Sequence, residues 1–422
     1  MKASVEAGGF TGSRAVIPGS KSIAHRMLIA AGLAEGVSRL KSVPESDDIA
    51  ATKRVLSCCG VRFETNEDET VVYGAGSHFR YDGTTADCGE SGSTLRFLIP
   101  LLVINGGEAV FQAAGRLPER PLTVYEEIFH QQGLCFERDG NKVKVQGPLK
   151  AGEYRLKGNV SSQFISGLLF ALPLKENDST IIVEEPFESS SYVDLTIDSL
   201  KRAGVYAERI GNVILVPGGQ KYHPVSGMVD ADDSQAVFFA ALAQIRGGSV
   251  HLTNMPHVSL QADRKFISLL QRMGMNVSEA EEGYVFRKGE LHGCTIDLSD
   301  CPDLGPMLFA LASQAEGETV FVNAGRLRLK ESDRIAAMEE ELRKLGCDIS
   351  SDSDTVYVRG KTEIRKGAEL DGHNDHRIVM ALSILVSGCD RASVIDGAEA
   401  VNKSWLGFFR DLSRMGVKVE LC

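Results

Sequence analysis

A nine-residue segment near the N-terminus, Pro18 to Arg26, combines side chains that bind anions. It places Lys21, Ser22 and Arg26 at the start of an apolar run. The run predicts a helix, and the N–H groups and positive dipole end of a helix N-terminus favour a negatively charged ligand. Lysine and arginine add full charges suited to phosphate or carboxylate. Taken alone, the segment is equally compatible with helix capping, because serine is a common N-cap residue.

Polar clusters of this kind recur along the chain at nearly constant spacing. Each precedes an apolar run, and the equivalent positions follow one another at intervals of about 70 residues: Lys21, Ser91, Ser162, Asp233, Asp303 and Asp375. A second series precedes amphipathic segments: 45–48, 116–120, 189–192, 261–264, 330–334 and 402–404. Capping explains the hydroxyls and carboxylates but not the cations, which oppose the helix dipole at an N-terminus. We therefore expect a cleft that binds a small polyanion.

The elements that must position these clusters repeat with the same period. A glycine, a β-branched strand, a polar turn and a helix recur six times, in units of about 70 residues. Each unit predicts the order strand, helix, strand, helix, strand, strand. The first helix of each unit is apolar all round and should be buried; these runs are 23–34, 95–104, 164–174, 236–245, 306–315 and 378–386. An α/β fold class follows. A solenoid is the alternative, although its repeats are usually about 20–50 residues long.

Composition narrows the class of ligand. The 422-residue chain is 43% hydrophobic and carries a net charge of −11, which disfavours nucleic acid and anionic membranes as partners. We expect a cytoplasmic protein, because the sequence lacks a membrane-length apolar run and the apolar core of a signal peptide. Nine scattered cysteines indicate free thiols rather than structural zinc. A Walker A loop would need glycine where Ala15 and Ser20 stand. His25, His223 and His373 are expected to be surface or packing residues.

Eight ordered motifs resemble those of the 5-enolpyruvylshikimate-3-phosphate synthase family. The resemblance extends from Lys2 to Val419. They are Pro-Gly-Ser-Lys-Ser-x-x-x-Arg at 18–26, Gly-x-Ser-Gly-Ser-Thr-x-Arg at 89–96, Arg-Leu-x-x-Arg-Pro at 116–121, Ser-Ser-Gln-Phe at 161–164, Pro-Asp at 302–303, Leu-Lys-Glu-Ser-Asp-Arg at 329–334, Asn-Asp-His-Arg at 374–377 and Asn-Lys-Ser at 402–404. The resemblance implies a two-domain inside-out α/β barrel built from six βαβαββ repeats, three per domain. One domain would comprise 1–13 and 229–422, the other would be inserted at 14–228, and the active site would lie in the interdomain cleft.

The reaction implied by the resemblance joins phosphoenolpyruvate to the 5-hydroxyl of shikimate 3-phosphate and releases phosphate. It proceeds by addition and elimination through a tetrahedral intermediate, in the shikimate pathway of aromatic amino acid biosynthesis. No metal or organic cofactor is implied, and neither nucleic acid nor a membrane is expected as a partner. A monomer is expected.

The resemblance also assigns residues to the two substrates. Shikimate 3-phosphate would contact Lys21, Ser22, Arg26, Ser161, Ser162, Gln163, Ser189, Asp303 and Lys330. Phosphoenolpyruvate would contact Lys21, Gly92, Arg116, Gln163, Arg334, Arg377 and Lys403. Asp303 is the expected base for the 5-hydroxyl. Lys21, Glu331 and His376 are candidates for the other proton transfers, and the residues alone do not apportion the steps among them.

Two departures from the family pattern concern charged residues, and the first lies close to the expected phosphoenolpyruvate site. Glu90 stands where Asn is common, and we expect its charge to pair with a nearby arginine; Arg326 stands where Asn or His is usual. A related alternative is the enolpyruvyl transferase that acts on UDP-N-acetylglucosamine. That enzyme carries Lys-Asn-Ala near its N-terminus and a reactive loop cysteine, whereas this chain has Lys21-Ser22-Ile23 and no cysteine near Arg116. A second alternative is a non-catalytic protein that binds phosphorylated metabolites, which would not need both Asp303 and Glu331.

Overall fold

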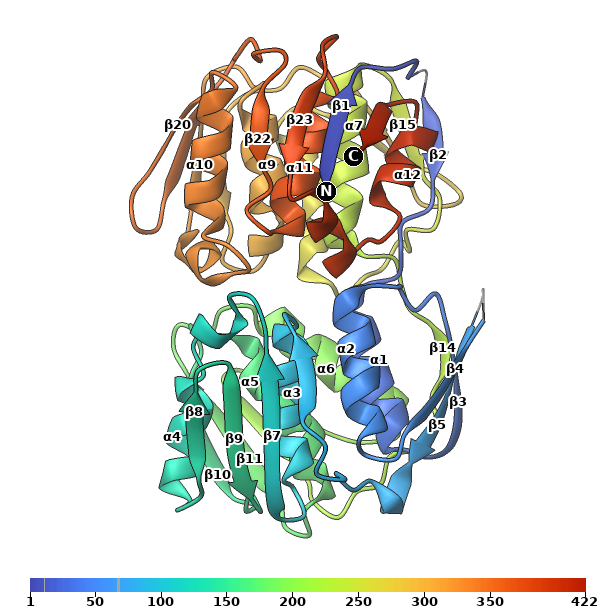
Figure 1. Ribbon diagram of the computed structural model, residues 1–422, viewed down its shortest axis with the longest axis vertical. Coiled ribbons are helices and arrows are strands. Elements are labelled where there is room, and N and C mark those ends of the chain that lie inside the picture. The colour runs from blue at the N-terminus through green and yellow to red at the C-terminus, as the bar shows by residue number, and fades with distance from the viewer. Residues whose placement is uncertain (11, 67–68) are drawn as a thin grey trace. The chain divides into compact units, whose positions relative to one another are not determined.

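The computed structural model describes residues 1–10, 12–66 and 69–422, and the chain folds into two compact units (Figure 1). Unit 1 comprises Met1–Pro18 and Ala231–Cys422, and unit 2 comprises Gly19–Asp230. The boundary expected after residue 13 lies further along the chain, because Ser13–Ala15 forms strand β2. This strand pairs in parallel with β15 (Ser249–Leu252) of unit 1. The second boundary, expected at 228/229, follows Asp230.

In its described residues each unit contains three four-stranded sheets, and all of them share one strand order. In β10-β11-β13-β12, strand β10 (Glu153–Lys157) runs parallel to β11 (Ser179–Glu184). Strand β13 (Val213–Val216) then pairs antiparallel with both β11 and β12 (Glu208–Ile210). A parallel pair needs a crossover connection, and a helix supplies it here.

The remaining sheets follow the same order. Those of unit 2 are β14-β3-β5-β4 (Ser226–Met228, Glu35–Lys41, Glu69–Ala75, Arg62–Thr65) and β6-β7-β9-β8 (Ala86–Gly89, Gly107–Ala113, Lys142–Gly147, Phe136–Asp139). Those of unit 1 are β22-β23-β1-β24 (Glu369–Asp371, Ser393–Asp396, Lys2–Glu6, Lys418–Leu421), β2-β15-β17-β16 (the last two Tyr284–Arg287 and Asn276–Glu279) and β18-β19-β21-β20 (Thr295–Asp297, Glu318–Val322, Val356–Arg359, Asp348–Ser351).

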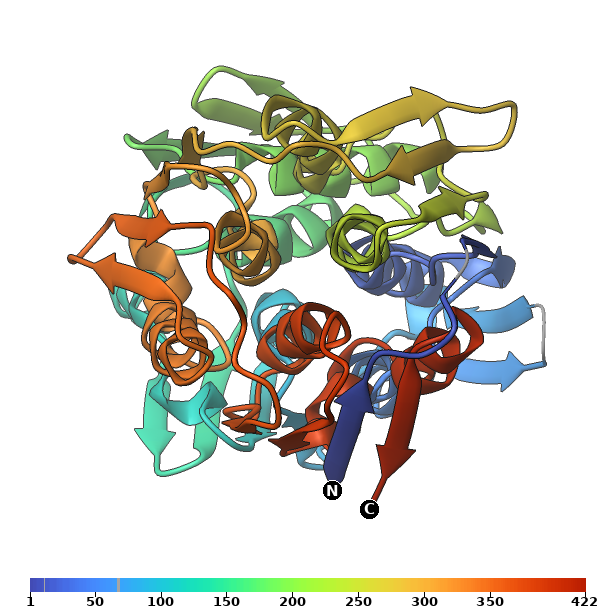
Figure 2. The ribbon, with the colours of Figure 1, turned by 90° about the horizontal axis from the view of Figure 1, so that it is seen from above.

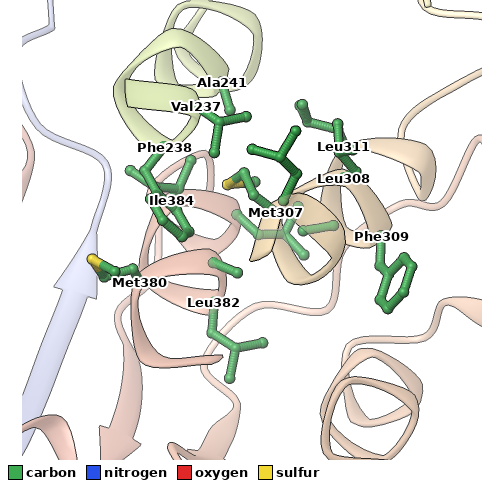
Figure 3. Close-up of a cluster of buried hydrophobic side chains, with 14 of the residues drawn as sticks. Val237, Phe238, Ala241, Met307, Leu308, Phe309, Leu311, Met380, Leu382 and Ile384 are labelled. Atoms are coloured by element: carbon green, nitrogen blue, oxygen red, sulfur yellow. The ribbon is translucent and has the colours of Figure 1, made fainter. Parts of the chain in front are cut away.

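The apolar helices form the interior of each unit. In unit 2 they are α1 (Lys21–Leu33), α3 (Gly92–Leu102) and α5 (Ser162–Ala171), and in unit 1 they are α7 (Asp233–Arg246), α9 (Gly305–Ala312) and α11 (His376–Val386). Figure 2 looks down on α7, α9 and α11, with the strands of unit 1 outside them. In Figure 3, Phe238 of α7, Met307 of α9 and Ile384 of α11 pack together. A helix surrounded in this way is buried on every side, which explains its uniform apolar composition.

The more polar helices lie between the sheets and carry the second series of polar clusters. They are α2 (Asp47–Ser57), α4 (Thr123–Gln131), α6 (Ser190–Arg202), α8 (Phe266–Arg272), α10 (Arg334–Lys344) and α12 (Phe408–Arg414). Short 3-10 helices precede some of them, namely η2 (Leu117–Glu119), η4 (Ala262–Lys265), η6 (Gly325–Leu329) and η7 (Ala398–Lys403). Another, η5 (Pro302–Leu304), precedes the apolar helix α9. Across the described ranges, every helix is too short or too polar to cross a bilayer.

Candidate active site

Three cations of unit 1 converge on the carboxylate of Asp303, in η5. Arg334 Nη1 lies 2.8 Å and Lys330 Nζ 3.2 Å from Asp303 Oδ1, and Arg377 Nη2 lies 3.0 Å from Oδ2. Arg334 is the first residue of α10, Arg377 is the second residue of α11, and Lys330 directly follows η6. Two helix N-termini therefore add their positive dipole ends to three full charges, which makes the cluster suited to anions.

The charges around Asp303 decide its protonation. Burial raises the pKa of this carboxyl, but Arg377, Lys330, Arg334 and His376 together outweigh burial and hold the pKa well below its ordinary value. Burial also lowers the pKa of Lys330, although the charge of Asp303 opposes that decrease. Asp303 is consequently a carboxylate at neutral pH, able to accept a proton from a substrate hydroxyl.

Arg334 is fixed from three sides by carboxylates. Its Nε lies 2.8 Å from Asp375 Oδ2 and its Nη2 lies 2.6 Å from Glu331 Oε2, and the side chain is only 1% exposed. Ser332 Oγ donates to the same Asp375 oxygen at 3.1 Å. Asp375 Oδ1 accepts the backbone N–H of Arg377 at 2.9 Å and so caps α11. One buried carboxylate thereby holds the starts of α10 and α11 together.

The other cations of this cluster are anchored by neighbouring backbone and hydroxyl groups. Arg377 donates from Nη2 to Ser234 Oγ at 2.8 Å and from Nη1 to Ser234 O at 3.1 Å. Lys403 Nζ donates to the carbonyl of Asn374 at 2.6 Å. His376 is buried, with Nδ1 3.8 Å from Asp375 Oδ1. Four Lys and Arg side chains face three carboxylates, so the cluster keeps an excess of positive charge for a ligand.

In unit 2, the N-terminal motif places Lys21 at the first position of α1. Lys21 Nζ lies 2.7 Å from Asp48 Oδ2, which belongs to the first turn of α2. Arg26, one turn further along α1, is 2% exposed and donates four of its five N–H groups to protein acceptors. Their acceptors are Thr196 Oγ1 (2.8 Å), Ser22 O (2.6 Å), Tyr192 O (3.0 Å) and Ser166 Oγ (3.3 Å). Burial lowers the pKa of Arg26 to about 10. Arg26 therefore links α1 to α5 and α6, in addition to its expected contact with the substrate.

The serines and glutamine assigned to shikimate 3-phosphate lie at the starts of α5 and α6. Ser161 caps α5 by accepting the N–H of Gln163 at 3.3 Å. The Gln163 side chain accepts from Arg96 Nη1 at 2.7 Å and donates to Ser93 Oγ at 2.9 Å. Ser189, 1% exposed, precedes α6 with φ of 53°. A left-handed conformation at a residue other than glycine, asparagine or aspartate is uncommon and often marks a functional position.

The structure places Arg120, rather than Arg116, against Gly92. A methyl group at Gly92 would lie 2.8 Å from Arg120 Nη1 and 3.2 Å from Arg96 Nη1, so the ends of both arginine side chains approach this backbone position closely. Arg116 is 46% exposed, and its Nε lies 3.4 Å from Glu119 Oε2. Both arginines belong to the motif Arg-Leu-x-x-Arg-Pro, and spacing alone did not indicate which one reaches Gly92.

Sequence reasoning also missed the residues that hold the expected ones in place. These are Asp48 for Lys21, Arg96 for Gln163, Asp375 for Arg334 and Ser234 for Arg377. Asp48, Asp375 and Ser234 lie in recurrent polar clusters, so the spacing was a signal for them, but a cap and a side-chain anchor have the same sequence signature. Arg96 lies within the apolar run 95–104, where the spacing gave no such signal. The Glu90 carboxyl group packs against Gly115, and its pairing with an arginine stays a prediction.

Comparisons with known proteins agree over nearly the whole chain. The family profile described as EPSP synthase (3-phosphoshikimate 1-carboxyvinyltransferase) matches residues 11–412. A 3-phosphoshikimate 1-carboxyvinyltransferase of Clostridium novyi is 41% identical over 414 residues, 95% of this chain and 94% of that protein. One of Clostridium kluyveri is 40% identical over 407 residues, 96% and 95% of the two chains. A solved EPSP synthase of Acinetobacter baumannii superimposes over 100% of both chains with a TM-score of 0.82 and 27% identity. The enolpyruvyl transferase NikO of Streptomyces tendae shares the fold, with a TM-score of 0.79 and 16% identity over 99% of this chain and 98% of that one.

Proposed function

The chain belongs to the EPSP synthase (3-phosphoshikimate 1-carboxyvinyltransferase) family, and we propose that Asp303 and the cations around it perform the chemistry of that reaction. The family uses shikimate 3-phosphate and phosphoenolpyruvate, and this protein is an enolpyruvyl transferase of the shikimate pathway. The observation that carries the proposal is the convergence of Lys330, Arg334 and Arg377 on one carboxylate. Such an arrangement supplies a base and an anion site within one group of side chains.

Phosphoenolpyruvate carries a phosphate and a carboxylate, and bidentate guanidinium groups suit both. We assign it to Arg334, Arg377 and Lys403, with Lys21 and Gln163. In place of Arg116 we assign Arg120, because its guanidinium lies at Gly92, the first residue of α3. The backbone N–H groups at this helix start and the positive end of its dipole would strengthen the binding of a phosphate.

Shikimate 3-phosphate is assigned to hydroxyl groups at two helix starts. Ser161, Ser162 and Ser189 would bind its phosphate together with Lys330. Lys21, Ser22, Arg26 and Gln163 would orient the remainder of the molecule, and Asp303 would accept the proton of the 5-hydroxyl. Serine hydroxyl groups suit this task because each can donate to a phosphate oxygen in the direction that the phosphate requires.

The reaction consists of an addition step followed by an elimination step. The 5-hydroxyl oxygen attacks C2 of phosphoenolpyruvate while C3 gains a proton, and Asp303 takes the hydroxyl proton. The tetrahedral adduct then loses a proton from C3 and expels phosphate, which restores the carbon–carbon double bond. Lys21, Glu331 and His376 are proposed to move the C3 proton. The cations stabilise the charge that develops on the leaving phosphate.

Ligand binding would tune the base. An arriving phosphate or carboxylate competes with Asp303 for Arg334 and Arg377. Because these cations hold the pKa of Asp303 low, their diversion to the substrate would raise that pKa toward its ordinary value. A general base whose pKa lies closer to the working pH is more effective. Asp303 would thus become a stronger base when the donor substrate is bound.

A phosphate-release assay tests the proposed function. Purified protein should release phosphate only when both shikimate 3-phosphate and phosphoenolpyruvate are present, and UDP-N-acetylglucosamine should not replace the acceptor. Arg120→Ala should raise KM for phosphoenolpyruvate by about tenfold or more, whereas its matched control Arg116→Ala should change it by less than about threefold. Absence of phosphate release from folded protein would contradict the reaction, and the reverse ranking of the two arginine variants would contradict the assignment.

We also propose that the enzyme acts as a cytoplasmic monomer without a metal or organic cofactor. Every assigned anion contact comes from Lys, Arg, Ser, Gln or backbone groups of this one chain. Chelator treatment should therefore leave phosphate release unchanged, and the active species should elute at the mass of one 45.6 kDa chain. Loss of activity on chelation, restored by a divalent cation, would contradict this proposal.

A further inference from the structure

The turn that leads into α11 is held by a contact between two side chains that the reaction does not use, His373 and Glu341. We propose that this contact positions the cations that bind phosphoenolpyruvate. The inference rests on the function proposed above for Arg334, Arg377 and Lys403. It assigns His373 as a positioning residue, in contrast to the surface or packing role expected from sequence.

The turn has an unusual backbone. His373 and Asn374 both adopt positive φ, 49° and 51°. Single left-handed residues occur in many proteins, most often glycine, asparagine, aspartate or histidine. Two in succession without a glycine persist only where the surrounding structure imposes them. The turn therefore depends on contacts outside itself.

Glu341 of α10 supplies those contacts from a fully buried position. Its Oε1 lies 2.9 Å from His373 Nε2, and its Oε2 accepts the backbone N–H of Asp371 at 3.0 Å. Asp371 Oδ1 in turn accepts the backbone N–H of His373 at 2.6 Å. The hydrogen bond to Glu341 raises the pKa of His373, which favours the form that donates from both ring nitrogens. Both ends of the turn are thus bound to one carboxylate.

The ligand-binding groups depend on the shape of this turn. The carbonyl of Asn374 accepts from Lys403 Nζ at 2.6 Å. The next residue, Asp375, holds Arg334 and caps the helix that begins with His376 and Arg377. Glu341 lies two helical turns after Arg334 on the same helix, so the contact fixes the distance between the starts of α10 and α11. Relaxation of the turn would move an acceptor of Lys403 and the carboxylate that aligns both arginines.

A metal ion is not needed to explain this cluster. Glu340, Glu341 and His373 offer ligand atoms within 4.8 Å of one another. However, Lys344 Nζ already lies 2.7 Å from Glu341 Oε1 and 3.1 Å from Glu340 Oε1. The ammonium group supplies the positive charge that two adjacent carboxylates require. The cluster is accordingly a structural anchor made of protein groups.

Two substitutions separate the side-chain contact from the backbone conformation. His373→Asn keeps a residue that tolerates positive φ, but its amide is too short to reach Glu341. His373→Gln places an amide nitrogen near the position of His Nε2 and can restore the hydrogen bond. We expect His373→Asn to raise KM for phosphoenolpyruvate about tenfold and His373→Gln to stay within about threefold of wild type. KM for shikimate 3-phosphate should change by less than about twofold in both.

The outcomes distinguish positioning from general destabilisation. A purely structural role would lower the active fraction, and hence kcat, with both KM values unchanged, and that result would overturn the inference. A KM for phosphoenolpyruvate in the Asn variant equal to that of wild type would also overturn it. Should His373→Asn not fold, Asp371→Ala tests the same turn from an exposed position, with Asp371→Asn as its control. The Ala variant should raise KM for phosphoenolpyruvate and the Asn variant should not, and an unchanged KM in the Ala variant would overturn the inference.

Arg377→Ala separates this inference from its premise. A higher KM for phosphoenolpyruvate in Arg377→Ala, with His373→Asn unchanged, would refute only the positioning role. An unchanged KM in Arg377→Ala would refute the proposed function of the cluster, and the inference with it.

Discussion

Unit 1 contains two aspartate–arginine pairs with the same spacing and different chemistry. Asp233 and Arg264 are 31 residues apart, as are Asp303 and Arg334. The second pair follows the first by one sequence repeat. In both, the aspartate lies near the start of an inner helix and contacts the arginine through Oδ1 at 2.8 Å. In one pair the aspartate is fully buried, whereas the other pair belongs to the candidate active site.

The surroundings of the two carboxylates differ in burial and in charge. Asp233 is fully buried, and its pKa is raised to about 6, chiefly by burial, which Arg264 and a hydrogen bond from Ser259 only partly offset. Asp303 is 22% exposed and contacts three cations, which hold its pKa well below the ordinary value despite burial. Leu260 occupies the position of Lys330 in the preceding repeat, so the earlier pair lacks that cation.

The comparison shows that equivalent positions in the fold can give two aspartates different surroundings and opposite pKa shifts. The repeated architecture places a carboxylate and a guanidinium side by side in both cases. Asp303 has additional cations and access to solvent, which suit the proposed role of a ligand-responsive base, whereas Asp233 is fully buried against Arg264. A sequence motif that records only the Asp and Arg positions does not separate these outcomes.

The largest expected effect is on catalysis. Asp303→Asn retains the shape and most hydrogen bonds of the side chain but removes the base, so kcat should fall by about 10³-fold, within the range for a positioned proton-transfer group. The matched variant Asp233→Asn should keep kcat within about twofold of wild type. Steady-state kinetics with both substrates at saturation would measure the difference. Similar losses in both variants would break the distinction between the two pairs.

The next effect is on the pH dependence of stability. The folded protein holds a proton on Asp233 up to about pH 6, whereas the unfolded chain loses it near 3.8. Burial of this group therefore costs stability as pH rises between these values. A pKa difference of one unit corresponds to about 1.4 kcal/mol. Between about pH 4 and a pH above 6, the free energy of unfolding of wild type should therefore fall by about 3 kcal/mol relative to that of Asp233→Asn.

Asp303→Asn serves as the control of opposite sign. A depressed pKa adds stability above the unfolded pKa, and that stability is lost as pH falls through the folded pKa. This variant should therefore be less stable than wild type at neutral pH, with the difference shrinking toward acid. Urea denaturation at a series of pH values, corrected for changes in slope, would measure both trends. A flat difference between wild type and Asp233→Asn would show that Asp233 titrates normally.

Much of this architecture follows from local sequence patterns. The run 236–245 predicted the helix observed as Asp233–Arg246, and the run 23–34 predicted Lys21–Leu33. Apolar periodicity reports burial directly, because a helix enclosed by other elements must be apolar all round. The polar clusters at the helix starts likewise identified Asp303, Lys330, Arg334 and Arg377, the residues that the structure brings together.

The partners of those residues were less predictable because they come from distant parts of the chain. Asp375 accepts a hydrogen bond from Arg334, which is 41 residues away, and Ser234 accepts one from Arg377, which is 143 residues away. Helix capping and ligand binding select the same residue types, so sequence did not reveal which arginine of 116–120 turns toward Gly92. The boundary beside β2 was missed because three residues of an edge strand, Ser13–Ala15, carry too little pattern.

The smallest effect concerns the serines that support each pair. Ser259 Oγ donates to Asp233 at 2.7 Å, and Ser332 Oγ donates to Asp375, the anchor of Arg334, at 3.1 Å. Either change to alanine should cost about 1–2 kcal/mol of stability, because a buried carboxylate loses a donor. Only Ser332→Ala should affect kinetics, with KM for phosphoenolpyruvate raised about twofold to threefold, since only Asp375 contacts an arginine that we assign to phosphoenolpyruvate. Denaturation curves and KM values for both substrates would separate the two effects. If Ser259→Ala raised KM for phosphoenolpyruvate as much as Ser332→Ala, the buried pair would be coupled to the ligand site. That result would contradict the contrast drawn between the two aspartates.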